Sequence, residues 1–108
     1  MSKRIVDKGH LQYVSTLPCI ICGTAKQIQV HHLLKPYDGI RGLSMRSGDN
    51  NVIPLCFPHH TELHTTFGNE EKFFIHHGYF AETGRQVAKN LWDSKTIYRP
   101  EEDDGLPF

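Results

Sequence analysis

The sequence has no long apolar run, no net charge and few cysteines. Its 108 residues include twelve Lys/Arg, twelve Asp/Glu and three cysteines, so the formal net charge is zero. No stretch approaches the ~18 consecutive apolar residues of a membrane-spanning helix. The N-terminal residues also lack the pattern of a signal peptide. These absences predict a cytoplasmic protein that has no membrane partner.

The zero net charge hides an uneven distribution. Residues 1–48 carry seven Lys/Arg against two acids, whereas residues 49–108 carry five against ten. Four of those ten acids form the run EEDD at positions 101–104. Without this run the chain is mildly basic, which suits a few phosphate contacts but not a strong non-specific attraction to nucleic acid. Ordinary scatter of surface charge explains the same numbers equally well.

The three cysteines are spaced as metal ligands. A chain of this size buries only a modest core, so a bound metal would add needed stability. In a reducing compartment, an odd number of cysteines with one pair in a C-x-x-C spacing is more typical of a metal site than of disulfides. Zinc favours four tetrahedral sulfur or nitrogen ligands. We therefore predict one structural Zn²⁺ held by two clips, "CIIC" and "CFPH", with ligands Cys19, Cys22, Cys56 and His59. The alternative treats the cysteines as small buried hydrophobic residues.

The periodicity along the chain predicts an α+β fold. Residues 27–33 and 51–55 have the composition of short strands, which we expect to pair as an antiparallel hairpin. A helix should follow the second strand, because Pro58 suits a first helical turn and Gly68 suits a helix end. Capping residues and apolar spacing predict three flanking helices, at 8–17, 69–78 and 83–93. We expect one domain over residues 1–98 and a disordered acidic tail over residues 99–108.

Histidine is unusually abundant. The sequence contains eight, and seven of them lie between positions 31 and 77. His60 and His64 are four residues apart on the predicted helix, so they face the same side and can chelate one cation. His31 and His32 are adjacent on a strand, where side chains alternate, so only one can point toward that helix. We expect one of them to complete a second metal site and the other to act as a base. Taken alone, the pair would be better explained as one solvent-facing ring and one core ring.

Three motifs, "VHHL", "NVIPLC" and "HHTELH", resemble those of the HNH, or ββα-metal (His-Me finger), nuclease family. The resemblance covers residues 19–64 by motif. The flanking stretches "YVSTLPCIICG" and "VAKNLWDSK" look more narrowly like the phage-associated recombination enhancement function (Ref) group. The resemblance implies a DNA endonuclease with a structural Zn²⁺ and a catalytic divalent metal, Mg²⁺ or another ion. It also implies a setting in phage-type recombination, with a recombinase filament as partner.

The resemblance also implies individual roles. Carried over by position, it makes His31, His60 and His64 the ligands of the catalytic metal. His32 becomes the general base of the hydrolysis. Asn51 matches the asparagine that orients this base by hydrogen bonding, and the neighbouring Asn50 is the alternative.

Two other classes of function remain open. A zinc-stapled module that binds nucleic acid or protein without cleavage needs only the cysteine-containing site, so the remaining histidines favour an enzyme. A metal hydrolase acting on a small phosphate ester is disfavoured, because the chain has a long basic loop, residues 35–49, and no Gly-rich phosphate cradle. In and beside that loop, we expect phosphate or base contacts from Lys35, Tyr37, Arg41 and Arg46.

Overall fold

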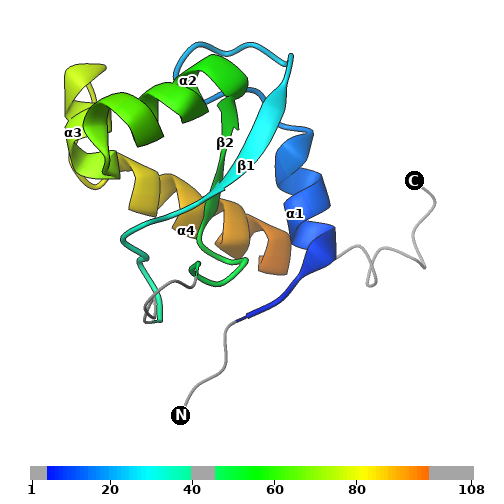
Figure 1. Cartoon of the computed structure of the whole chain (residues 1–108). Coiled ribbons are helices and arrows are strands. Elements are labelled where there is room, and N and C mark those ends of the chain that lie inside the picture. The colour runs from blue at the N-terminus through cyan, green and yellow to red at the C-terminus, as the bar shows by residue number, and fades with distance from the viewer. Residues whose placement is uncertain (1–4, 40–45, 98–108) are drawn as a thin grey trace.

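The computed structural model describes residues 5–39 and 46–97. The predicted acidic tail and Arg41 lie outside these residues. The described part of the chain contains four α-helices, a π-helical turn and two strands (Figure 1). In chain order these are α1 (Lys8–Ser15), β1 (Ile28–His32), β2 (Val52–Cys56), α2 (Phe57–Glu62), η1 (Leu63–Phe67), α3 (Glu70–His76) and α4 (Thr83–Ile97). No helix in these ranges is long and apolar enough to span a membrane.

The two strands form the predicted antiparallel hairpin. Ile28 lies opposite Cys56 at one end, and His32 lies opposite Val52 at the other. Every residue of β2 is buried. In β1 only His31 is buried, and Gln29, two residues earlier on the same side of the strand, is exposed. The hairpin therefore places a cysteine at one end and the adjacent histidines at the other.

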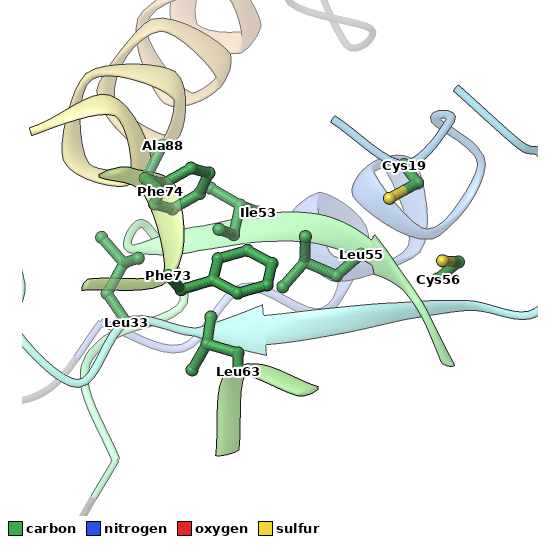
Figure 2. Packing of buried hydrophobic residues seen from close by; sticks show 9 residues of the cluster. All are labelled: Cys19, Leu33, Ile53, Leu55, Cys56, Leu63, Phe73, Phe74 and Ala88. Carbon is green, nitrogen blue, oxygen red and sulfur yellow. The ribbon is translucent and has the colours of Figure 1, made fainter. Parts of the chain in front are cut away.

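Helices enclose the hairpin and form the core with it. Figure 1 shows the strands between α2 and α4, with α1 beside them, and each of these helices contacts β2. The buried side chains form one apolar cluster that includes Leu33, Ile53, Leu55, Leu63, Phe73, Phe74 and Ala88 (Figure 2). Each large apolar side chain buried in this way contributes about 1.5–3 kcal/mol to folding. The small α+β architecture is confirmed.

Local signals set most helix ends. The Asp7 side chain caps α1 by accepting a hydrogen bond from the backbone N–H of His10 at 2.9 Å. Asn69 caps α3 in the same way through Lys72 N, also at 2.9 Å. These two caps agree with the prediction, since such side chains satisfy amides that have no partner inside the helix.

The predicted helix after β2 differs in one respect from the structure. It is α-helical only as far as Glu62 and then widens into η1. The N–H of Gly68 donates to the carbonyl of Leu63, five residues earlier, at 2.7 Å, and Gly68 adopts a left-handed φ of 78°. This wider turn ends the helix with Leu63 fully buried in the core.

Candidate metal centres

The predicted structural-metal ligands come together where β2 ends and α2 begins. Cys22 Sγ lies 3.8 Å from Cys56 Sγ, and His59 Nδ1 lies 3.7 Å from Cys19 Sγ and 3.2 Å from Cys56 Sγ. Tetrahedral bonds of ~2.3 Å to sulfur and ~2.0 Å to nitrogen would hold two sulfurs about 3.8 Å apart and a sulfur and nitrogen about 3.5 Å apart. All four ligand atoms lie within 4.8 Å of one another. The cluster therefore fits one four-coordinate metal ion.

The turn that carries the first two cysteines directs amides toward sulfur. Gly23 has a left-handed φ of 76°, and its N–H donates to the carbonyl of Cys19 at 2.8 Å. Within this turn the N–H of Ile21 points at Cys19 Sγ, at 3.4 Å. Such a contact favours the charged thiolate, which is the form that binds metal.

The thiols in this cluster are free, and their charges conflict without a cation. Burial raises the pKa of Cys19, but backbone hydrogen bonds, first from Cys56 and then from the turn itself, together with the ring of His59 outweigh it and lower the pKa to about 6. Burial is also the main cause at Cys56, where it raises the pKa to about 11. The side chains of Cys19 and Cys22 and the charge of Cys19 also raise the pKa of Cys56, and a bound cation removes this repulsion between thiolates.

Three imidazoles form a second cluster between β1 and the helix that follows β2. His31 Nδ1 and His64 Nε2 each lie 3.1 Å from His60 Nε2. Tetrahedral metal–nitrogen bonds of ~2.0 Å would hold neighbouring nitrogens about 3.3 Å apart. His31 is buried and His64 is exposed, so one side of the cluster faces solvent. Three protein ligands with an open side are typical of catalytic rather than structural metal sites.

Two partner side chains fix which nitrogens face the centre of this cluster. His31 Nε2 lies 2.7 Å from Glu70 Oε2, and His60 Nδ1 bonds Gln29 Oε1. Both oxygens only accept hydrogen bonds, so both rings donate outward. His31 Nδ1 and His60 Nε2 are then left with lone pairs that face each other. Lone pairs at this separation repel, and a cation between them converts the repulsion into coordination.

The surroundings of the three-histidine cluster disfavour protonation of His60 and His64 but remain suited to a metal cation. Burial, and then the nearby rings of His31 and His64, lower the pKa of His60 to about 4. Burial is also the main cause that lowers the pKa of His64. Burial acts to raise the pKa of Glu70, but hydrogen bonds from His31 and from backbone amides outweigh it, so the pKa is lowered. Neutral rings backed by an ionised carboxylate are the states that metal binding requires.

His32 makes a different contact from its neighbour, as strand alternation predicted. Its Nε2 lies 2.8 Å from Asp49 Oδ1, and the two side chains are 9% and 2% exposed. His31 contacts His60 on α2, whereas His32 contacts Asp49 in the segment that leads into β2. The separation of the two rings agrees with the prediction, and the role of His32 as a base stays a prediction.

The side chain of Asn51, which the resemblance assigned to orienting His32, bonds the loop that follows β1, and its role toward His32 stays a prediction. Asn51 Oδ1 accepts from the backbone N–H of Tyr37 at 2.9 Å and of Asp38 at 3.3 Å, and its Nδ2 donates to the Asp38 carbonyl at 3.1 Å. Asn50 also bonds Asp38, through its carboxylate at 2.9 Å. Both asparagines thus fasten the loop that follows β1, because their side chains turn toward that loop.

The sequence was compared with known protein families, and one family matches it over most of its length. A family described as "Protein of unknown function (DUF968)" matches residues 2–89. The chain belongs to the DUF968 family. It is also similar to a protein of Escherichia coli (strain K12) described as "Uncharacterized protein YdfU", with 38% identity over 72 residues. That match covers 66% of this chain and 20% of the relative, so the chain spans about a fifth of the relative's length. No solved structure matches the chain.

Sequence reasoning missed three polar residues of this DUF968 chain. Asp49 and Glu70 are buried carboxylates, at 1% and 3% exposure, that contact the adjacent histidines. Glu70 begins α3, where an acid is usually explained by the helix dipole alone. Gln29 carries a weak signal, because it stands two residues before His31 and therefore on the same side of β1.

A third group of possible ligands borders the cysteine cluster. His77 Nε2 lies 2.7 Å from Glu62 Oε1, and both lie close to His59. The His77 ring stands edge-on to the His59 ring, with centroids 5.2 Å apart. Because His59 Nδ1 already faces the cysteines, we interpret this pair as packing that supports His59.

The described loop residues that we expected to contact DNA differ in how available their side chains are for that contact. Lys35 Nζ lies 3.0 Å from Glu71 Oε2, so part of its charge is neutralised. Tyr37 packs against the core cluster, which limits stacking on a base. Arg46 is exposed and remains suited to a phosphate contact.

Replacing Glu70 by glutamine is expected to weaken metal binding at the three-histidine cluster about 10- to 100-fold, the usual effect of removing a ligand's supporting carboxylate. The amide keeps the shape of the side chain but lacks the charge that supports His31. Glu71→Gln is the matched control, because Glu71 is the adjacent acid and pairs with Lys35 instead. Calorimetric titration with Mn²⁺ or Zn²⁺ of protein already loaded at the cysteine cluster measures the change. Equal affinities for the two variants would contradict the assignment.

Proposed function

We propose that this chain is a metal-dependent DNA endonuclease of the HNH type. The observation that carries the proposal is the convergence of ring nitrogens from His31, His60 and His64, next in sequence to a separate histidine, His32, that contacts Asp49. The order strand, strand, helix around these side chains supports it, as does the motif resemblance. We also propose that the structural metal is Zn²⁺, because three sulfurs and one nitrogen are a typical zinc set.

The mechanism assigns each proton and charge to a residue. Neutral His32 accepts a proton from the water that attacks phosphorus, opposite the leaving 3′ oxygen. A new P–O bond forms, the bond from phosphorus to the 3′ oxygen breaks, and the leaving oxygen takes a proton from solvent. When bound at the three-histidine cluster, a divalent ion supplies Lewis acidity for the phosphate and the leaving oxygen. His31, His60 and His64 are neutral ligands, so they leave the ion's charge available to an anionic substrate.

The cysteine cluster has a positioning role in this proposal. His59 and His60 are consecutive on α2, and they face different clusters. Fixing His59 to the cysteines therefore sets the rotation of α2 and turns His60 and His64 toward β1. The structural Zn²⁺ would thus be needed for the catalytic geometry as well as for the fold.

The test of the proposal is cleavage of supercoiled plasmid and single-stranded DNA by zinc-loaded protein, with added Mg²⁺, Mn²⁺ or no added ion. We expect cleavage that depends on the added ion. His64→Ala should abolish it, whereas His76→Ala, which removes an exposed histidine outside the cluster, should not. DNA binding without cleavage under every condition would contradict the proposal and favour the binding module. Cleavage by His64→Ala at the wild-type rate would contradict the metal assignment.

DNA binding by the chain alone is expected to be weak and sensitive to salt. Without the EEDD run the sequence has twelve Lys/Arg against eight acids, so few phosphates are neutralised. With about two or three phosphate contacts, the logarithm of the binding constant should fall with a slope of roughly −2 to −3 against the logarithm of salt concentration. We propose that a recombinase filament on DNA concentrates the enzyme. Fluorescence anisotropy with His32→Ala protein tests this, and nanomolar binding to random duplex at physiological salt would count against recruitment.

A further inference from the structure

We infer that Asp49 is the positioning residue for His32 and fixes Nδ1 as the nitrogen that accepts the proton from water. The inference rests on the proposed function and deepens it. It assigns to a buried carboxylate the orienting role that the resemblance gave to an asparagine.

The contact itself decides which ring nitrogen carries hydrogen. Asp49 Oδ1 lies 2.8 Å from His32 Nε2, and a carboxylate can only accept. The hydrogen of neutral His32 therefore sits on Nε2, which leaves the lone pair on Nδ1. Because the Asp49 side chain is 2% exposed, solvent screens this interaction little.

The surroundings of Asp49 hold its carboxylate in place. Its second oxygen, Oδ2, accepts from the backbone N–H of Asp7 at 2.8 Å. The backbone N–H of Asp49 donates to the carbonyl of Ile5, also at 2.8 Å. On the other side, Ser47 Oγ donates to the carbonyl of Leu33, the residue after His32, at 2.9 Å. The carboxylate is thus bonded to the segment before α1, and the loop that carries it is bonded to the residue that follows β1.

This arrangement gives the carboxylate a defined part in proton transfer. When Nδ1 takes the proton from water, the ring becomes a cation, and the adjacent negative charge stabilises it. Asp49 stays ionised throughout, and the proton leaves Nδ1 to solvent after cleavage. In serine proteases, replacing the equivalent carboxylate by an amide leaves the wrong tautomer and lowers kcat about 10⁴-fold.

Asp49→Asn is the variant that tests the inference. Its amide has one acceptor oxygen but must face two donors, Asp7 N–H and His32 Nε2–H. With the oxygen on the Asp7 N–H, the amide N–H₂ meets Nε2 and moves the ring hydrogen to Nδ1. We expect cleavage to fall about 10²- to 10⁴-fold. Asp38→Asn is the matched control, since it makes the same change at an exposed acid that contacts Asn50.

Two measurements separate positioning from a merely structural role. In the double variant with His32→Ala, the rate should be no lower than in His32→Ala alone, because residues that act as a unit are not additive. Nitrogen-15 NMR of the His32 ring should show hydrogen on Nε2 in the wild type and on Nδ1 in Asp49→Asn. Multiplied losses in the double variant, or an unchanged tautomer in Asp49→Asn, would overturn the inference.

Measuring the tautomer of the His32 ring as well as DNA cleavage distinguishes failure of this inference from failure of the proposed function. If the wild type cleaves no DNA but the tautomer changes as expected, the endonuclease proposal fails and the positioning of His32 stands. If the wild type cleaves and Asp49→Asn cleaves equally well, the inference fails and the endonuclease proposal stands. Should Asp49→Asn not fold, the wild-type spectrum still decides, because hydrogen on His32 Nδ1 would overturn the inference.

Discussion

Replacing His32 by alanine is expected to lower DNA cleavage about 10²- to 10⁴-fold while both metal clusters keep their affinity. Among the described residues, the His32 ring belongs to neither group of possible metal ligands, and it contacts Asp49. Loss of the ring therefore removes the proton acceptor without removing a metal ligand. Single-turnover cleavage rates, measured together with the metal content of the protein, give both quantities.

His31→Ala is the matched control for this variant, because it changes the adjacent residue of the same strand. It should lose activity together with metal at the three-histidine cluster, since His31 Nδ1 is part of that cluster. Cleavage by His32→Ala at the wild-type rate, with contaminating nuclease excluded, would mean that another group accepts the proton.

Removal of the structural metal is expected to unfold the domain. Cys19, Cys56 and His59 join the turn before β1, the end of β2 and the start of α2. Structural zinc sites contribute about 10–16 kcal/mol at neutral pH, whereas whole domains are stable by only about 5–15 kcal/mol. The free energy of metal binding is thus as large as the whole free energy of unfolding of a typical domain. Circular dichroism melts of Cys19→Ser and Cys56→Ser should show no cooperative transition.

Acid should have the same effect, because protons compete with the metal for thiolates and imidazole. Zinc release, followed with a colorimetric chelator, is expected to coincide with unfolding as the pH falls. His77→Ala serves as a control, since it alters packing beside His59 and leaves all four ligands in place. A full cooperative melt in zinc-free cysteine variants would refute the dependence.

Much of the scaffold was predictable because its signals are local. The caps at Asp7 and Asn69, the proline in the first turn of α2 and the spacing of both metal clips depend on residues within four positions of one another. The hairpin followed from two short apolar stretches of strand-forming residues. The prediction that adjacent histidines separate came from the alternation of side chains along a strand.

The supporting carboxylates were not predictable in the same way. Asp49 is 17 residues from His32 in sequence, and Glu70 is 39 residues from His31. Nothing in the neighbourhood of either acid indicates burial, because Asp49 lies in a Gly-containing loop and Glu70 occupies a common helix-start position. Asn51 was assigned by its place in a motif, but its side chain bonds the loop at Tyr37 and Asp38. Only the three-dimensional path of that loop determines these partners.

The two proposed metal centres should be coupled, because their ligands His59 and His60 are neighbours on α2. A single turn of α2 carries one ligand of each, so an ion at either centre restricts the same few backbone dihedrals. The second ion to arrive pays less conformational entropy, which is positive cooperativity, and linkage requires that it be reciprocal. The weaker ion should therefore slow extraction of the tighter one by a chelator, and the thiolate centre should fill first as metal concentration rises.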